Sequence, residues 1–581
     1  MTGRLTVNPA RRSQPGEWQG WLGIAAALLA GVGVAVLVWA AAYAVDPTIS
    51  WPSAFYIGLA TGTVGWPASA TPLAVGSVVV GAGLIGFGVV RSHRRKARAS
   101  RVDSKAGSMA RAGDLRTLLP AGAASDAERL GASSASDGVP IGRLMPGRQV
   151  LRSSWEWTQV WLMGPRAGKT STVCVRQVAE TNGPCLATSN KRDIVDMTRG
   201  LRSRLGTVWV FDPQTIVGEE ARWWWNPLSY ITGVAEAQEM AALFAAAGRS
   251  PEDRTDAYFD VEGQNYLASL LLAAATAEQP ITQVLTWAAR PGDNEPADVL
   301  AMAGYAGMSE SLRSIILLAD RQRDGVVGTA RKSIAWLGNP ELLPWITPLG
   351  PHDRRPQFDP RRFVESRQTL YVVSREGRGT ARAVTAALTV ATVTAAEKLA
   401  SGSPRGRLAV PLAVVLDEAA NIVRWPDLPD LYSHYGSRGI AVSTFLQSWN
   451  QGVEVWGRDG MEKLWSAANV RVIGSGLAQA QHLQDASVLI GDHDVVTHDV
   501  SVSPRSGGLF SSGRSTSTRL NRERIFETHE LAALPRNRAV MLSAGAPAAL
   551  IELIHYSETE YASDIDASES YYTGRAGAVA R

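Results

Sequence analysis

The stretch "WLMGPRAGKTS", residues 161–171, is the segment that most strongly indicates the fold of this chain. It ends like a phosphate-binding loop, GxxxxGK(S/T), in which backbone N–H groups surround phosphates, a Lys reaches the outer phosphates and a hydroxyl binds Mg²⁺. The closing GKT, residues 168–170, fits that pattern, but Met163 occupies the first glycine position and the glycine follows at Gly164. Because backbone N–H groups hold the phosphates whatever side chain precedes them, the sequence still predicts a working nucleotide site.

The residues on either side of the loop support this prediction. Residues 158–163 are typical of a strand, and "KTSTVCVRQVAE", which begins at Lys169, is typical of the helix that leaves such a loop. A helix that starts here points its free N–H groups at the phosphates. We expect Lys169 to be catalytic and the nucleotide to be bound by Gly164, Pro165, Arg166, Ala167, Gly168, Lys169, Thr170 and Ser171.

A second signal lies far downstream, in "LAVVLDEAANI", residues 412–422. Four apolar residues precede Asp417 and Glu418, as in a buried strand that ends in an acidic pair. Asp417 is predicted to bind Mg²⁺ together with Thr170, and Glu418 to orient and deprotonate the attacking water. An acidic pair alone more often satisfies a helix N-terminus. Both motifs together, in this order, favour a nucleotide hydrolase.

A third signal is the next expected strand, residues 440–446, which ends in Gln447. A single Gln at a strand end is more often solvated. Its position after the acidic strand makes it a candidate catalytic residue that senses the terminal phosphate or orients water.

The pattern beyond residue 150 predicts an α/β fold, because short Val- and Ile-rich runs alternate with Ala-rich helical stretches. Residues 229–359 show Ala and Leu at helical spacing without strand-like runs, which predicts an inserted all-α domain. The nucleotide-binding domain would then comprise residues 151–228 and 360–556. The polar chain end, residues 557–581, favours a disordered tail.

The N-terminal membrane region, residues 1–95, contains two apolar runs. Residues 20–45 are uncharged and exceed the roughly 20 residues that cross a bilayer. Residues 73–90 form a shorter, glycine-rich run that we also expect to span. Arginines before the first and after the second run place both ends in the cytoplasm. A cleaved signal peptide is the alternative, but the first run is longer than the apolar core of such a peptide.

The segment after the second run is basic and then polar. Its basic cluster, residues 91–101, is more typical of a segment that binds anionic lipids than of a nucleic-acid site. Residues 96–150 are rich in Ala, Ser, Gly and Asp, which predicts a flexible linker. A net charge of +4 over 581 residues does not indicate a nucleic-acid partner. Cys174 and Cys185 give no disulfide framework and no zinc spacing, so we expect both to be reduced and buried.

Two further patterns have a structural and a functional interpretation. The tryptophans of "RWWWNPL", residues 222–228, could stack on bases, but such clusters more often anchor a lobe or an interface. The segment "GDHDVVTH", residues 491–498, resembles a metal site but lacks a further ligand, so an exposed loop is favoured.

Six motifs, in order along the chain, carry a family resemblance: "GPRAGKTS", "CLATSNKRDI", "VWVFDPQ", "VVLDEAANI", "GSRGIAVSTFLQS" and "NVRVIGSG". The set resembles the coupling proteins of type IV secretion and conjugation, the TraG/TraD/VirD4-like ATPases. The resemblance covers residues 153–556, and the two apolar runs with a basic exit agree with it.

The resemblance implies a RecA-like P-loop ATPase core that uses ATP and Mg²⁺, assembles as a homo-hexamer and recruits substrate through its all-α domain. It implies a multi-pass protein of the bacterial cytoplasmic membrane with its ATPase domain in the cytoplasm. There it would receive a relaxase bound to single-stranded DNA and drive both into a type IV secretion channel. An arginine from the neighbouring subunit usually completes such sites; Arg438 is the candidate, and Arg471 is the second choice.

Two other functions stay open on the sequence alone. An FtsK-like translocase of double-stranded DNA also has membrane spans before a P-loop domain, but no winged-helix module is visible near the end of this chain. A docking scaffold that binds nucleotide without turnover is supported only by Met163. An intact Lys169 and Glu418 favour hydrolysis, because a scaffold has no use for a water-activating carboxylate.

Overall fold

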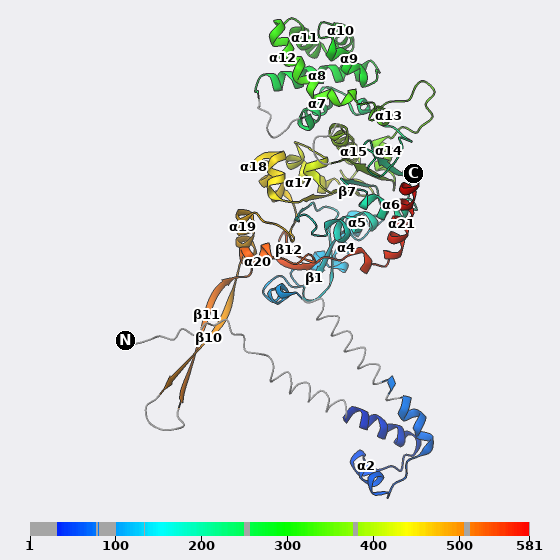
Figure 1. Cartoon of the computed structure of the whole chain (residues 1–581), viewed down its shortest axis with the longest axis vertical. Coiled ribbons are helices and arrows are strands. Elements are labelled where there is room, and N and C mark those ends of the chain that lie inside the picture. Colours follow the sequence, from blue (N-terminus) through cyan, green and yellow to red (C-terminus); the bar gives the residue numbers. More distant parts are fainter. Residues whose placement is uncertain are drawn as a thin grey trace. The chain divides into compact units, whose positions relative to one another are not determined.

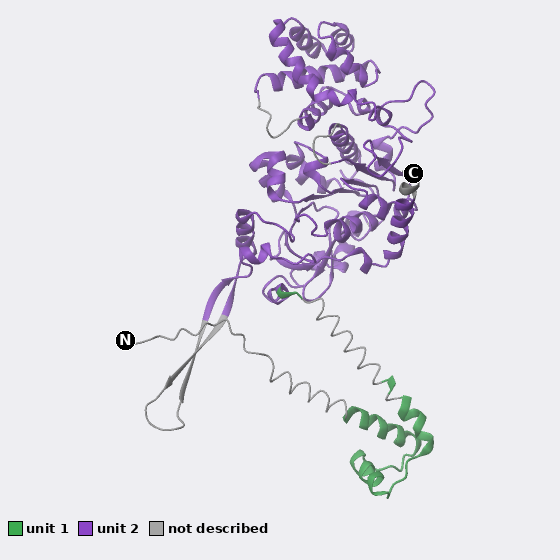
Figure 2. Cartoon of the chain, in the orientation of Figure 1, with its two compact units in different colours: residues 1–101 green, residues 102–581 purple. Residues whose placement is uncertain are grey.

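A computed structural model of the chain describes residues 32–76, 79–80, 100–132, 134–248, 256–375, 381–504 and 512–579. The chain divides into two compact units, residues 1–101 and residues 102–581 (Figure 2). Unit 2 contains every motif of the predicted nucleotide site.

Unit 2 is built around one sheet of 11 strands in the order β2-β1-β13-β12-β9-β3-β8-β7-β4-β6-β5. The strands from β9 to β5 run parallel, and the other four continue the sheet in antiparallel pairs. The predicted α/β fold with a parallel sheet is confirmed. The strands are β1 Val139–Leu144, β2 Val150–Ser153, β3 Gln159–Leu162, β4 Cys185–Ser189, β5 Val208–Phe211, β6 Thr369–Val373, β7 Leu412–Leu416, β8 Ile440–Leu446, β9 Val470–Ile473, β12 Arg538–Ser543 and β13 Ala549–Glu552.

The central strands are apolar along their whole length because helices cover both faces of a parallel sheet. Every residue of β3, β7 and β8 is buried. Cys174 and Cys185 are buried and free, as predicted. The helices of this part are α5 Val175–Ala179, α6 Asp193–Arg202, α14 Pro360–Val364, α15 Arg382–Gly402, α16 Ala419–Ile422, α17 Leu428–Ser437, α18 Trp449–Ala467, α19 Ala480–Ile490 and α20 Thr528–Ala532.

The predicted flexible linker, residues 96–150, is wrong for most of its length. It contains a 3-10 helix, Arg101–Ser108, helix α4, Pro120–Leu130, and strand β1, which pairs with β13. The 3-10 helix is fixed by Asp103, whose carboxylate accepts from the Arg538 guanidinium at 2.7 and 2.9 Å. The small, polar composition hid the order because the segment completes the sheet of a larger unit instead of forming a core of its own.

A helical lobe lies between β5 and β6 in the chain, and Figure 1 draws its helices side by side. Helix α8 has the longest buried run of the lobe and packs against α7 and α12. Among the described residues from 227 to 364 there are helices and one isolated bridge, Trp224 to Gln357. The lobe helices are α7 Val234–Gly248, α8 Phe259–Thr276, α9 Thr282–Ala289, α10 Glu295–Met302, α11 Ala306–Ile316, α12 Asp320–Ile334 and α13 Leu343–Ile346.

Aromatic side chains connect the lobe to the sheet, in a cluster that we call the aromatic joint: Trp209, Phe211, Trp223, Trp345 and Phe358. Trp223 contacts all four others, with ring centroids 5.3–5.9 Å apart. Its indole N–H also donates to the carbonyl of Val210 at 3.2 Å. The "RWWWNPL" segment therefore anchors the lobe.

The chain end is a helix, α21, Ala562–Val579, so the predicted disordered tail is wrong over this range. The helix packs on α6, where the Ser568 hydroxyl contacts the Asp196 carbonyl at 2.5 Å and the Gly200 N–H at 2.9 Å. Arg204 pairs with Asp564 at 2.9 Å. The sequence looked disordered because it has few apolar residues to bury: among residues 562–574, Ile565 is the one fully buried apolar residue. Polar contacts such as those of Ser568 and Asp564 help to hold the helix in place.

The segment predicted as an exposed loop near residues 491–498 starts a two-stranded sheet instead. Strand β10, Asp492–Pro504, pairs with β11, Ser512–Arg524, in antiparallel register. Among the described residues, no three His, Cys, Asp or Glu side chains are grouped so that they could hold a metal ion.

The described part of unit 1 contains a helix at Val32–Val45 and helix α2, Pro52–Thr61. Of the predicted spans, residues 20–45 and 73–90, the parts 20–31, 77–78 and 81–90 lie outside the described residues. Among the described helices, only α15 is long and apolar enough to cross a membrane, and 78% of its apolar window is buried. Burial in the core of unit 2 accounts for its composition.

Replacing Trp223 by Ala tests the aromatic joint. Removing a buried indole with four aromatic neighbours should lower the free energy of unfolding by about 3–5 kcal/mol. Urea denaturation followed by circular dichroism measures this change. The matched control is Arg222→Ala, whose side chain is 66% exposed; it should change stability by less than about 1 kcal/mol. Equal effects would show that Trp223 has no special role.

His482 of α19 should make stability depend on pH. It is 8% exposed and stacks on Trp449 with centroids 4.6 Å apart. Burial lowers its pKa to about 4, against the opposing effect of Asp485. The unfolded chain protonates this His below about pH 6.5, so the folded state should lose up to about 3 kcal/mol as pH falls from 6.5 to 4. Denaturation across this range should be flatter for His482→Gln, whereas the exposed control His434→Gln should leave the profile unchanged.

Candidate nucleotide-binding site

The loop after β3 has the backbone turns that surround a phosphate. Arg166 and Gly168 have positive φ angles of 59° and 87°. Such turns aim successive N–H groups into one concave surface, which attracts anions. The loop leads into a π-helical turn, Thr170–Cys174, and then α5. The GKT half of the motif thus has the expected strand, loop and helix around it.

The departure at Met163 is accommodated by glycines that follow β9. The Met163 side chain is fully buried, and a Cβ added at Gly474 would lie 2.6 Å from its Cγ. The N–H of Gly164 donates to the Ser475 carbonyl at 2.9 Å, and a Cβ on Gly164 would overlap the Gly476 carbonyl. The methionine side chain therefore occupies the space that a side chain at position 474 would need. Gly164 allows the loop backbone to lie close to the backbone of Gly476.

Lys169 contacts the acidic pair that the sequence places far away. Its ammonium contacts Glu418 Oε1, from a residue 249 positions along the chain, and lies 3.6 Å from Asp417 Oδ1. The side chains are 11%, 4% and 4% exposed in the order Lys169, Asp417, Glu418. Burial disfavours the charge on Lys169, but the two carboxylates outweigh it and raise its pKa. The ammonium therefore stays charged.

The two predicted metal ligands lie next to each other. Thr170 Oγ1 is 3.4 Å from Asp417 Oδ2. Burial raises the pKa of Asp417 to about 6, although Lys169 opposes that shift. Asp417 is positioned by Thr188 of β4, whose hydroxyl donates to the Asp417 carbonyl at 2.9 Å.

Glu418 has an unusual backbone and a second polar partner. Its φ and ψ are 55° and 42°, the left-handed region, which costs a non-glycine residue roughly 1–2 kcal/mol. Gln447 Nε2 donates to Glu418 Oε1 at 2.7 Å, and Asn421 Nδ2 lies 3.4 Å from Oε2. Strand β8 lies between β3 and β7, so Gln447 at its end is adjacent to both motifs. The structure thus brings Lys169, Thr170, Asp417, Glu418 and Gln447 together.

Arg438 does not join this group within the chain. It follows α17 and precedes β8, so it lies at the edge of the sheet opposite the carboxyl ends, and its Nη1 donates to the Gly406 carbonyl at 3.4 Å. Arg471 lies within β9, paired in register with Val160. A catalytic Arg438 would have to act from a neighbouring copy, and that role stays a prediction.

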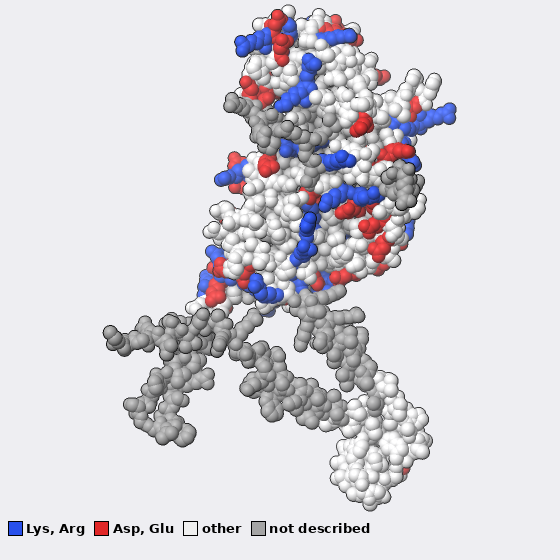
Figure 3. Space-filling view, viewed as in Figure 1, with Lys and Arg blue, Asp and Glu red and all other residues white. Residues whose placement is uncertain are grey.

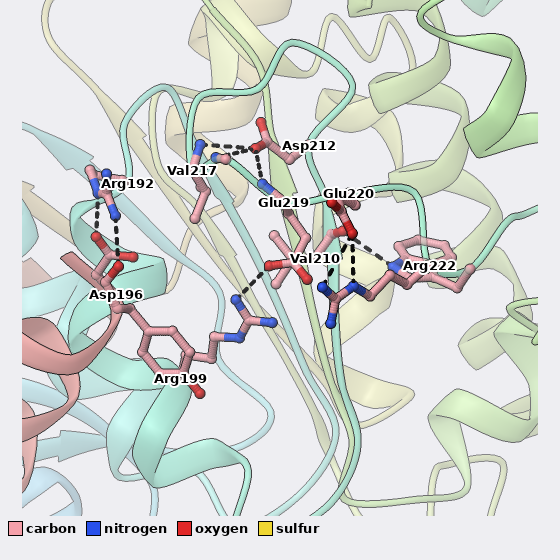
Figure 4. A network of polar contacts seen from close by, with 12 residues as sticks. Arg192, Asp196, Arg199, Val210, Asp212, Val217, Glu219, Glu220 and Arg222 are labelled. Atoms are coloured by element: carbon pink, nitrogen blue, oxygen red, sulfur yellow. Dashed lines mark hydrogen bonds and ion pairs between the residues drawn. The ribbon is translucent and has the colours of Figure 1, made fainter. Parts of the chain in front are cut away.

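The carboxyl edge of the sheet also carries a polar network that was not predicted from the sequence (Figure 4). Asp212 follows β5 and accepts from the backbone N–H groups of residues 216–219 at 2.7–3.1 Å. Arg199 of α6 pairs with Glu219 at 2.7 Å. Gln214 accepts an N–H from the segment after β6 at 2.9 Å. The Asp-Pro after an apolar run is a turn signal that could have indicated this loop.

The other supporting residues carry no signal in a single sequence. These residues contact the backbone or the side chains of the site residues, and most of these contacts form only when the strands are in this order. They are Thr188, Asn421, Gln451, Gly474 and Gly476. Gln451, for example, accepts the N–H of Gln447 at 2.9 Å. Chemically, the site combines a phosphate-type loop, the Lys169 cation, two carboxylates and an amide at one edge of the sheet.

A family model matches one segment of the chain. Residues 411–536 match the family described as "TraM recognition site of TraD and TraG". The matched range contains Asp417, Glu418 and Gln447. Among curated proteins, none matches the chain in sequence.

Solved structures of the bacterial conjugative coupling protein TrwB, in the form TrwBdeltaN70, share the fold. The unbound monoclinic form has a TM-score of 0.50 and 16% identity, and covers 74% of this chain and 91% of that chain. The trigonal form in complex with sulphate has the same score and identity, and covers 74% of this chain and 92% of that chain. At this identity the likeness concerns the fold. The segment match and the shared fold together confirm the resemblance of this chain to the TraG/TraD-like coupling proteins.

Proposed function

We propose that this chain is a membrane-anchored ATPase that couples ATP hydrolysis to the transfer of single-stranded DNA and its bound relaxase through a type IV secretion channel. The observation that carries the proposal is the meeting of Lys169 with Asp417 and Glu418 at the carboxyl edge of a parallel sheet. That edge is where open α/β sheets bind ligands.

The side chains divide the chemistry of hydrolysis among them. The loop N–H groups and Lys169 bind the phosphates of ATP, and Lys169 neutralises charge on the outer phosphate. Glu418 accepts a proton from the attacking water, and Gln447 orients that water through the amide that now contacts Glu418. When ATP binds, Lys169 must leave Glu418 for the phosphates, which frees the carboxylate to act as a base.

The residues present fit a Mg²⁺ ion. Thr170 and Asp417 offer the oxygen ligands that Mg²⁺ prefers beside a nucleotide, and Asp417 Oδ1 is buried with no hydrogen-bond partner among the described residues. A bound Mg²⁺ would supply charge neutralisation at the phosphate oxygens. Thr170 and Asp417 would hold it.

Unit 1 supports membrane anchoring. Residues 32–80 contain one charged residue, Asp46, and Figure 3 shows this part almost without blue or red atoms. Large apolar side chains are exposed there, including Trp51 at 80% and Ile57 at 65%. An exposed apolar surface of this kind is stable in lipid. We propose two spans at residues 20–45 and 73–90, with the ATPase domain in the cytoplasm of a bacterium.

The remaining parts of the proposal concern assembly and partners. In a homo-hexamer, Arg438 or Arg471 of one copy would complete the site of the next; within the chain Arg438 follows α17 and Arg471 lies within β9. The matched segment, residues 411–536, supports a relaxosome-type protein as partner. The proposed recruiting lobe, residues 229–359, comes between β5 and β6 in the chain, and β1 adds to the sheet of the nucleotide-binding domain.

ATPase assays with single-site variants test the core of the proposal. Lys169→Ala and Glu418→Gln should each lower DNA-stimulated ATP hydrolysis by at least about 100-fold, because one removes phosphate binding and the other removes the base. Glu418→Gln should still bind ATP. Arg438→Gln alone should lose activity. Assemblies that mix Arg438→Gln with Glu418→Gln should regain part of it, because a site can then combine the intact Glu418 of one copy with the intact Arg438 of its neighbour.

The DNA dependence separates the proposal from its alternatives. Hydrolysis should rise with single-stranded DNA at several salt concentrations. Stimulation only by double-stranded DNA would favour an FtsK-like translocase. Full DNA transfer in cells by Glu418→Gln would favour a scaffold without turnover.

Gly164→Ala tests the contact between the loop and β9. The added methyl group overlaps the Gly476 carbonyl, so the loop must shift, and ATP affinity should fall by at least about tenfold. Titration with a fluorescent ATP analogue measures this change. The control is Gly328→Ala, where an added Cβ meets nothing within 4 Å; equal affinities for both variants would contradict the role given to Gly164.

A further inference from the structure

A cavity of about 500 Å³ lies beside the aromatic joint and is separate from the nucleotide site. It is formed by α15, by the start of α14 and by the turn after Trp225. None of its lining residues belongs to the phosphate loop or to the acidic pair. Its volume is in the range of natural ligand sites.

The floor of the cavity is apolar and buried. Trp225 is fully buried, Phe358 is 1% exposed, and Ala391 and Ala395 of α15 are 2% and 8% exposed. The two alanines are four residues apart, so they lie on one face of the helix. Their small side chains leave the space that a larger pair, such as leucines, would fill.

The rim of the cavity is basic. Arg361, Arg362 and Lys398 line it and are exposed. Asp359 is the one acidic lining residue, and its carboxylate already accepts the Arg361 N–H at 2.8 Å and lies 3.6 Å from Arg362 Nε. Lys398 pairs with Glu236 at 2.7 Å. Arg361 and Arg362 carry two positive charges against the single negative charge of Asp359, so the rim above the apolar floor is positive.

The floor also contains a polar group that needs a partner. The Nε1 of Trp225 is buried and has no hydrogen-bond partner among the residues that the structure describes. A buried indole N–H normally donates to an acceptor. Because Trp225 lines the cavity, an acceptor on a bound molecule could satisfy it.

The combination indicates a peptide and not a nucleic acid. Base stacking needs an exposed ring face, whereas Trp225 and Phe358 present almost none. A peptide offers an apolar side chain for the floor, backbone carbonyls for the indole N–H and carboxylates for the arginines. We propose that this cavity binds an acidic peptide segment with one large apolar anchor residue, supplied by a protein partner. The site goes beyond ATP hydrolysis and does not depend on it.

Fluorescence anisotropy with the detergent-solubilised full chain tests the proposal. The probe is a fluorescein-labelled heptapeptide with a central Phe flanked by glutamates. Ala395→Leu, which fills the cavity, and the double variant Arg361→Glu with Arg362→Glu should each weaken binding at least about tenfold. The matched control is Arg354→Glu, an exposed arginine of the same segment outside the lining, which should bind like the unaltered chain.

Three readouts make the result decisive. Replacing the Phe of the probe by Ala should also weaken binding, because the floor loses its anchor. The ATPase rate of Ala395→Leu should stay within about twofold of the unaltered chain, which shows that the variant is folded. Equal binding by Ala395→Leu and the unaltered chain would overturn the proposal. Binding of a labelled oligonucleotide that is lost in the double arginine variant, without peptide binding, would assign the cavity to nucleic acid and would also overturn it.

Discussion

The structure depends on a buried cluster of one cation and two anions. Removing Lys169 from water beside Asp417 and Glu418 is favourable only when the three groups compensate one another, because an isolated buried charge is very costly. Strands β3 and β7 lie on either side of β8, and in this order the lysine reaches the carboxylates. In the proposed function, the phosphates of ATP would replace the carboxylates as the partner of the lysine.

The centre of the fold could be predicted from the sequence because its signals are local. Strands β7 and β8 coincide with the predicted apolar runs, and each ends in the residues that were expected to act. Lys169, Thr170, Asp417, Glu418 and Gln447 meet as a consequence, since parallel strands place their carboxyl ends on one edge.

Other parts of the structure depend on distant partners and left no local pattern. Strand β1 looked like part of a linker because one of its pairing partners is β13, which is contributed by the far end of the chain. Helix α21 looked disordered because its contacts with α6 are mostly polar. The effect of Met163 could not be judged either, because Gly474 and Gly476 follow β9, a strand that becomes the neighbour of β3 only in the folded sheet.

The ordered segment at the start of unit 2 has a mechanical consequence. The Asp103 and Arg538 pair ties the chain to β12 immediately after residue 101, and β1 then pairs along β13. Tension applied through the N-terminal side of the chain would therefore meet this clamp and the pairing of β1 with β13 before it reached β3 and the phosphate loop along the chain.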